Sequence, residues 1–417
     1  MTEWPWQASW RWLWLVPFFG LAWRWVGLNG FSAWRRLPFV AVLGLALAAF
    51  GTLLSSHFFP GIGPSLHVAA FAALCLFLFD LWRRPRLGVS WAYHFSLWHL
   101  WLLLWIAGSA CLVALIVIKT DFHDQIRIQG HAAAVESMMR GNLPPHLQAF
   151  PEVALKYHFG GDLVAAILGY TLGLPALQAI DALQVGGWVL ANLCLYGLAR
   201  GLGLSRPFSI LALHWVLLAA GWAYLFDPSL AWPDSHLVFR KNLNPGVFSY
   251  AFQTPYALGF PLFFTYLASL KEWTLKPDLR RLGLAALILG TLSFFHIAFF
   301  FGSLACTLGM LAARPLWGEA SWHSALIQAA LMLAIALLIA ISAGGFFSPS
   351  EAYNRSVLAW SWPPGYLRHA PNPRAAPLSL LLMMAWYLST LGSLLLWALP
   401  VCALALRDLR NRPRPLS

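Results

Sequence analysis

The sequence predicts an all-α polytopic membrane protein with about ten transmembrane helices and a helical first extracytoplasmic loop. Of its 417 residues, 60% are hydrophobic and only 10% are charged, whereas soluble domains carry about 25% charged residues. Uncharged apolar runs of roughly 17 to 25 residues, the length that crosses a bilayer, recur along the chain. The 24 Trp and 29 Phe residues are typical of aromatic belts at the membrane interfaces.

The charge pattern excludes a nucleic-acid-binding protein, although the formal net charge is +12. Lys and Arg stand in short clusters between apolar runs, which is the positive-inside pattern of membrane proteins and forms no basic groove for a phosphate backbone. The five cysteines lie singly within apolar runs. Without paired spacing they predict neither a disulfide framework nor a zinc site.

The N-terminal segment, residues 1–36, is rich in Trp and carries Arg11 and Arg24. Because no small-residue cleavage site follows it, it is not predicted to be a cleaved signal peptide. An amphipathic helix in the membrane interface is the preferred interpretation, and an extra span is the alternative.

Residues 37–118 are predicted to form the first three transmembrane helices, at 37–56, 65–82 and 97–118. The basic clusters should all face the cytoplasm. These clusters are at 35–36, 83–86, 200 with 206, 271–281 and 407–414. With the cluster at 83–86 inside, the third span leads outward, so that residues 119–183 form an extracytoplasmic loop.

This loop lies outside and Arg200 must again be inside, so parity, the odd or even count of membrane crossings, allows only one crossing between them. Residues 163–183 are therefore predicted to be a helix in the outer interface, followed by one crossing through 186–199. The region 184–406 holds the remaining transmembrane helices, with outer loops at 227–254 and 344–377. Residues 407–417 form a basic cytoplasmic tail.

The chain must cross the membrane an even number of times between the basic clusters at 271–281 and 407–414, and two interpretations meet this condition. Either residues 282–313 form a hairpin that turns near His296, or residues 378–406 are divided near Gly392. The hairpin is the preferred interpretation.

The densest group of carboxylates, imidazoles and turn-forming residues lies at 120–162, directly after the third span. Apolar residues at helical spacing predict a helix over 123–140. If the helix begins near Asp121, then Asp121, Asp124 and His131 share one face. Such a face can hold a divalent cation or orient an acceptor hydroxyl for proton abstraction. The alternative is that the two carboxylates are ordinary residues of a helix N-terminus in water.

This stretch resembles the first extracytoplasmic loop of GT-C type glycosyltransferases, especially of poorly characterised bacterial members. The likeness covers about residues 119–206. The matching residues, in chain order, are Asp121-Phe122, His131-Ala132, Gly141, Pro144-Pro145, Pro151, Tyr157-His158-Phe159-Gly160 and Leu172-Gly173-Leu174-Pro175. The chain departs from the pattern in the extra hairpin at 37–82, and in Phe122 where an acidic residue is common.

The resemblance implies an inverting transfer of a sugar from a polyprenyl-phosphate-linked donor to an acceptor at the outer face. It implies that Asp121 is the general base or positions the acceptor, with Asp124 as the second catalytic candidate. Asp121, His123 and Asp124 are the candidate ligands of a divalent metal. Asp162 is expected to cap the interfacial helix.

The phosphate of such a donor needs cationic partners, and the outer loops supply Arg240, Lys241, Arg355 and Arg368. Guanidinium groups match phosphate geometry. The alternative for each is a side chain that snorkels to the interface. Four further residues complete the predicted substrate-binding set: His131, Tyr157, His158 and His296. For His296, a buried hydrogen-bonded histidine is the alternative.

The leading hypothesis is thus a glycosyltransferase of the bacterial inner (plasma) membrane, in contact with membrane lipid, with its active site facing the periplasm or exterior. One alternative is a transporter or flippase of a lipid-linked intermediate, which predicts polar groups and broken helices at the membrane midplane. The other is a non-catalytic membrane subunit with the same fold.

Overall fold

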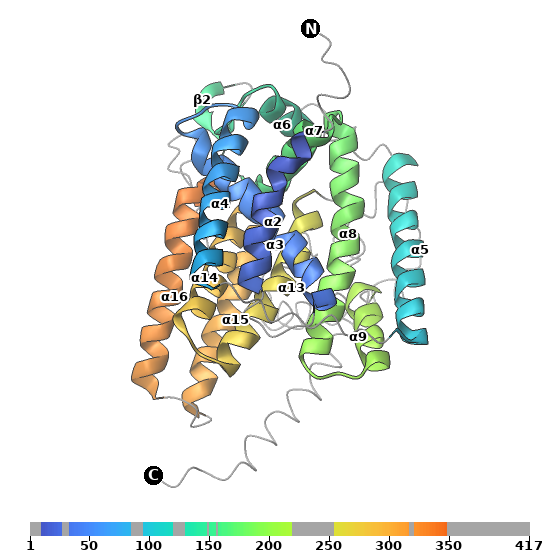
Figure 1. Ribbon diagram of the computed structural model, residues 1–417, viewed down its shortest axis with the longest axis vertical. Coiled ribbons are helices and arrows are strands. Elements are labelled where there is room, and N and C mark those ends of the chain that lie inside the picture. The colour runs from blue at the N-terminus through green and yellow to red at the C-terminus, as the bar shows by residue number, and fades with distance from the viewer. Residues whose placement is uncertain are drawn as a thin grey trace, which may run out of the picture. The chain divides into compact units, whose positions relative to one another are not determined.

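The computed structural model describes residues 10–26, 33–84, 95–119, 130–147, 150–155, 157–218, 254–316 and 321–347. The chain divides into two compact units, Met1–Ile210 with Ala251–Ala352, and Leu211–Tyr250 with Tyr353–Ser417. Nearly all described residues belong to the first unit, which is mostly helical (Figure 1).

Six helices among the described residues are long and apolar enough to cross a membrane. They are α3 (Ala33–Ser56), α4 (Ile62–Arg83), α5 (Leu97–Lys119), α8 (Ala176–Gly201), α15 (Ile297–Leu316) and α16 (Trp322–Ala343). The chain is therefore a polytopic helical membrane protein. The first three predicted spans correspond to α3, α4 and α5, and the total of about ten stays a prediction.

The remaining described elements are shorter or more polar. They are η1 (Arg11–Leu15), α2 (Val16–Val26), α6 (His131–Met139), α7 (Gly160–Leu172), α9 (Arg206–Leu218), α13 (Thr254–Leu275), α14 (Leu279–Phe295) and η5 (Gly345–Phe347). A small antiparallel sheet pairs β1 (His146–Leu147) with β2 (Phe150–Ala154).

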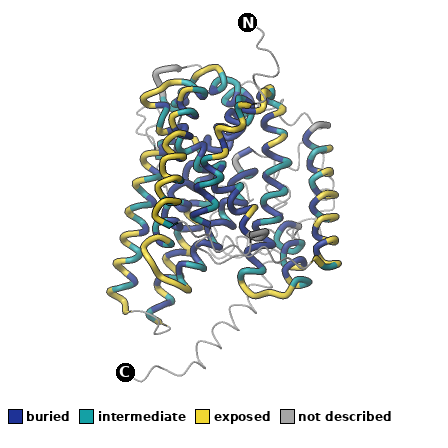
Figure 2. Tube along the Cα trace, in the orientation of Figure 1, coloured by how far each residue is buried: buried dark blue, intermediate teal, exposed yellow. Residues whose placement is uncertain are grey.

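Burial within the first unit separates a packed interior from apolar outer faces (Figure 2). Helices α4, α5 and α16 carry many exposed large apolar side chains, among them Phe71, Trp101 and Leu338. Such side chains are costly in water and favourable in a hydrocarbon layer. These faces support contact with lipid.

The N-terminal segment packs lengthwise along α4. The Trp14 and His67 rings lie 4.3 Å apart near one end, and Arg24 Nε lies 2.5 Å from Asp80 Oδ2 near the other. Residues 11–26 thus run parallel to α4 and bury Phe18 and other side chains against protein. The predicted place of this segment at a membrane interface stays a prediction.

One helix of span length lies between Asp162 and Arg200, as parity predicted, but its boundaries differ from the prediction. Gly173 (φ 69°) ends α7, and α8 starts at Ala176 and continues through Gly186 and Gly187. The predicted crossing at 186–199 was therefore too short. Helix α8 runs antiparallel to α5: Trp105 Nε1 donates to Asn192 Oδ1 (2.8 Å), and Trp188 Nε1 donates to Ser109 Oγ (2.9 Å).

Helix α7 is enclosed by protein on most sides, since ten of its thirteen residues are buried. It packs against α3, α6, α8 and α13. The sequence predicted a single helical stretch at 163–183 in the outer interface. Instead, 176–183 belong to α8, and α7 buries its apolar residues against neighbouring helices.

The run 282–313 is divided at His296, where the hairpin interpretation placed its turn. His296 has an extended backbone (φ −162°, ψ 112°) and separates α14 from α15. The alternative division near Gly392 lies outside the described residues.

Candidate functional site

The predicted site residues fall into two groups. Seven lie outside the described residues: Asp121, His123, Asp124, Arg240, Lys241, Arg355 and Arg368. The other four, His131, Tyr157, His158 and His296, are described, and the structure brings them together from three separate segments of the chain.

One expected arrangement of this loop is wrong. Gly130 has an extended backbone (φ −117°, ψ −157°), and α6 begins only at His131. A continuous helix over 123–140 therefore does not form. Glycine at position 130 favours such an interruption over helix propagation. Asp121 and Asp124, which were predicted to share a face with His131, lie outside the described residues.

His131 and Asp162 form a buried pair. His131 is the first residue of α6, and Asp162 lies in the first turn of α7. His131 Nδ1 and Asp162 Oδ1 are 2.7 Å apart, and Asp162 is only 1% exposed. A buried carboxylate is stable when it is paired and when a helix N-terminus faces it.

The expected capping role of Asp162 is wrong. Phe159 occupies the N-cap position of α7, and no side chain makes a capping hydrogen bond there. The Asp162 carboxylate turns to His131 of the neighbouring helix instead.

A row of neighbouring aromatic and imidazole rings continues from His131 into the helical bundle. The ring centroids of His131 and Tyr157 are 5.7 Å apart, and those of Tyr157 and His158 are 3.9 Å apart. His158 lies 4.9 Å from His296, which lies 4.1 Å from Tyr256 of α13. Tyr256 was missed because nothing in its local sequence distinguishes it from the many other aromatic residues.

Local backbone geometry positions this row. A Cβ at Gly160 would lie 2.9 Å from the carbonyl oxygen of Phe294. Glycine at this position therefore allows the start of α7 to dock against the end of α14. Tyr157 and His158 immediately precede this contact, and His296 immediately follows it. The close approach thus sets the two histidines side by side.

The surroundings shift the pKa values of the three histidines, His131, His158 and His296, in opposite directions. Burial by itself lowers the pKa of His131, but the charge of Asp162 and the hydrogen bond to it outweigh burial, and the net pKa is raised. Burial, followed by the charges of His296 and His131, lowers the pKa of His158 to about 3. Burial lowers the pKa of His296 to about 4. His158 and His296 are thus neutral at pH 7, and His131 is the imidazole among these three whose protonated form is favoured by its surroundings.

Two further groups complete the electrostatics. Burial, then the charges of Asp162 and Tyr256, raise the pKa of the Tyr157 phenol, which therefore stays protonated and available as a donor. His296 Nδ1 is buried and has no hydrogen-bond partner among the described residues. An unpaired buried nitrogen is costly, so it marks a place where a polar group is favoured.

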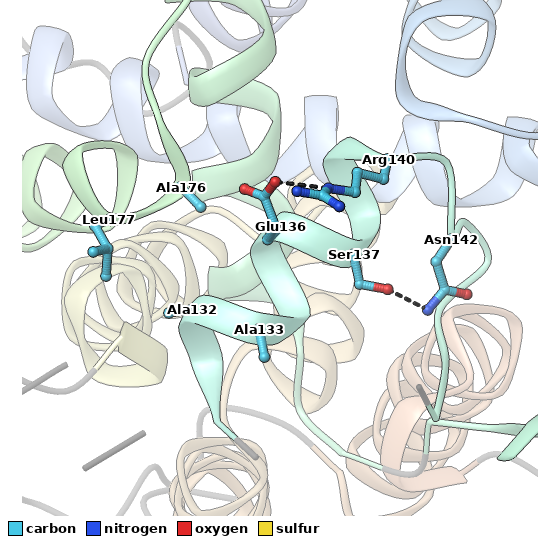
Figure 3. Close-up of a pocket in the computed structure, with 8 residues that line it drawn as sticks. All are labelled: Ala132, Ala133, Glu136, Ser137, Arg140, Asn142, Ala176 and Leu177. Atoms are coloured by element: carbon cyan, nitrogen blue, oxygen red, sulfur yellow. Dashed lines mark hydrogen bonds and ion pairs between the residues drawn. The ribbon is translucent and has the colours of Figure 1, made fainter. Parts of the chain in front are cut away.

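A groove of about 630 Å³ runs beside α6 (Figure 3). Its lining residues come from α6, the following turn and the start of α8: Ala132, Ala133, Glu136, Ser137, Arg140, Asn142, Ala176 and Leu177. Arg140 Nε donates to Glu136 Oε1 (2.8 Å), and Asn142 Nδ2 donates to Ser137 Oγ (2.8 Å). The groove combines small apolar walls with polar groups, and it lies along the helix that His131 begins.

The described residues contain no group of three or more His, Cys, Asp or Glu side chains placed to hold a metal ion. The predicted ligands Asp121, His123 and Asp124 lie outside those ranges. Metal binding therefore stays a prediction.

Comparison with protein-family models, curated proteins and solved structures finds no match to this chain. Its fold defines an integral membrane protein of the helical class. The site is a buried His–Asp pair that continues into a row of aromatic and imidazole rings.

Proposed function

We propose that this protein is an integral membrane glycosyltransferase. It transfers a sugar, with inversion, from a polyprenyl-phosphate-linked donor to an acceptor at the extracytoplasmic face, in a bacterial inner membrane that about ten transmembrane helices cross. The observation that supports this proposal is the meeting of His131, Tyr157 and His158 from the first loop with His296, around a buried carboxylate.

The chemistry of transfer requires groups on both sides of the sugar carbon. On one side, a basic group orients the acceptor hydroxyl and takes its proton, and on the other, positive charge stabilises the departing phosphate. We assign Asp121, with Asp124 beside it, to the acceptor side. The phosphate side is assigned to Arg240, Lys241, Arg355 and Arg368. A divalent ion on Asp121, His123 and Asp124 would add positive charge on the acceptor side, and carboxylates with an imidazole are suitable ligands.

The proposal is tested with right-side-out membrane vesicles and a panel of polyprenyl phosphates, each carrying one radiolabelled sugar. Asp121→Asn is expected to reduce transfer by about 100-fold or more, which is the usual effect of losing a carboxylate that deprotonates or positions the acceptor hydroxyl. Asp408→Asn, in the predicted cytoplasmic tail, is the matched control and should stay within about twofold of wild type.

The outcomes test the glycosyltransferase activity and the role of Asp121 separately. If the wild-type protein transfers no sugar from any donor of the panel, the glycosyltransferase proposal fails. If wild type and Asp121→Asn transfer sugar equally, Asp121 has no part in the chemistry, but the activity stands.

The alternative function, a transporter or flippase of a lipid-linked intermediate, is favoured by one observation. The chain breaks at His296, and the buried Nδ1 of this residue has no partner among the described residues. Broken helices and unpaired polar groups are typical of transport sites. Movement of a fluorescent polyprenyl phosphate across proteoliposomes, without any covalent product, would support this function over transfer.

A further inference from the structure

The His131–Asp162 pair has the arrangement of an acid–base dyad. Asp162 holds Nδ1 of the imidazole at 2.7 Å, and no other hydrogen bond of the ring involves a described residue. A carboxylate in this position fixes the ring orientation and the tautomer that carries the proton on Nδ1. The opposite nitrogen, Nε2, then carries the lone pair that can accept a proton.

The imidazole is less shielded than its partner. The His131 side chain keeps 16% of its surface exposed, whereas the Asp162 side chain keeps 2%. The carboxylate is thus enclosed by protein, and the imidazole is the accessible member of the pair. The groove along α6 provides about 630 Å³ for a substrate next to this helix.

The other histidines of the cluster are unsuitable as bases. His158 and His296, whose pKa values burial lowers to about 3 and 4, are weaker bases than His131, whose pKa is raised. A general base is most effective when its pKa lies near the working pH. Asp162 raises the pKa of His131, so His131 is the strongest base among these three histidines.

We propose that His131 is the general base of the transfer reaction and that Asp162 is its positioning residue. Nε2 of His131 takes the proton of the acceptor hydroxyl as the acceptor oxygen bonds to the anomeric carbon. The bond between that carbon and the phosphate oxygen breaks, and its electron pair leaves with the polyprenyl phosphate. The imidazolium, stabilised by Asp162, later loses the proton to water. This assignment rests on the proposed function and leaves Asp121 the role of positioning the acceptor.

The pH dependence follows from the groups that face His131. Among the described residues these are Asp162 from α7 and Tyr157 with His158 from the segment before it. Asp181 of α8, the other helix against α6, lines a small pocket with α5 residues. Because the base must be neutral, transfer should rise with pH through the His131 pKa, with a midpoint above the ordinary value of about 6.5.

The test uses the same vesicle assay with His131→Gln, His131→Ala and Asp162→Asn. His131→Gln should lower transfer by about 100-fold or more and abolish the rise with pH. Asp162→Asn removes the charge that raises the pKa, so its midpoint should fall to lower pH and its plateau should drop. Added imidazole should partly restore His131→Ala. His323→Gln, an exposed histidine on α16, is the matched control and should behave like wild type.

Size-exclusion profiles of the purified variants check that each one folds. This inference alone is overturned if His131→Gln transfers sugar as fast as wild type. It is also overturned if the pH midpoint does not move in Asp162→Asn. No transfer by wild type overturns the proposed function as well.

Discussion

Two carboxylates in this protein, Asp80 partly buried and Asp162 fully buried, are neutralised in different ways. Asp80 near the end of α4 pairs with two guanidinium groups: Arg24 Nε meets Oδ2 at 2.5 Å, and Arg84 meets Oδ1. Arg24 also donates to the backbone carbonyls of Asp80 (2.8 Å) and Arg84 (2.5 Å). Asp162, by contrast, pairs with one titratable imidazole.

The difference separates a structural contact from a reactive one. Arginine stays charged at every physiological pH and offers several donors in a fixed plane, so the Asp80 cluster ties the N-terminal segment to α4 without proton exchange. His131 is titratable, with a pKa that Asp162 raises, and its Nε2 has no hydrogen-bond partner among the described residues. Only the second pair is suited to proton transfer.

The largest expected effect is the loss of Asp80. Asp80→Ala leaves Arg24 buried without its carboxylate and should reduce the free energy of unfolding by about 3–5 kcal/mol. The double variant Arg24→Met with Asp80→Leu should recover most of this loss, because no unpaired buried charge remains. Thermal unfolding in detergent, followed by tryptophan fluorescence, measures both.

Glu136→Gln is the control for this experiment, since it breaks the exposed pair with Arg140 and should cost less than about 1 kcal/mol. An Asp80→Ala protein as stable as Glu136→Gln would show that the Asp80 cluster is not a structural tie.

The next effect tests the packing that holds the row of rings together. A Cβ at Gly187 of α8 would lie 2.1 Å from the carbonyl oxygen of Ala257, whereas one at Gly186 meets nothing within 4 Å. Gly187→Ala should therefore force α13 away, displace Tyr256 from His296 and cost about 1–3 kcal/mol.

Gly186→Ala is the matched control and should be neutral or stabilising by up to about 1 kcal/mol, because alanine favours helix over glycine. Equal unfolding temperatures for the two variants would contradict the close approach of α8 and α13.

The smallest expected effect is a difference in how the folding stability that each carboxylate pair contributes depends on pH. The folded pKa of His131 is raised above its unfolded value, so its pairing stabilises the fold fully below the unfolded pKa of about 6.5, and this contribution is lost as pH rises through the folded pKa. The stability difference between wild type and His131→Gln should thus be greater in mildly acidic than in mildly alkaline buffer. The loss of folding stability in Asp80→Ala should stay constant over the same pH range. If the losses in Asp80→Ala and His131→Gln changed with pH in the same way, the two carboxylate pairs would not differ as described.

Local sequence was sufficient for the membrane class and for much of the order of the helices. The apolar runs at 37–56, 65–82 and 97–118 correspond to α3, α4 and α5, because hydropathy and span length are local properties. The break at His296 was also anticipated. The basic clusters predicted one crossing between Asp162 and Arg200, and one span-length helix, α8, lies there, but it starts at Ala176, before the predicted crossing at 186–199.

What the sequence by itself determined is the concentration of polar residues at 120–162, from which His131, Tyr157 and His158 are predicted as site residues. The tertiary structure decided which side chains these residues contact. It places Asp162 beside His131, 31 residues away in the chain, and it places Tyr256 of another helix beside His296. The physical reason is that a buried charge is stable only beside a suitable partner. Which partner it meets depends on helix packing, here on the close approach of Gly160 to Phe294.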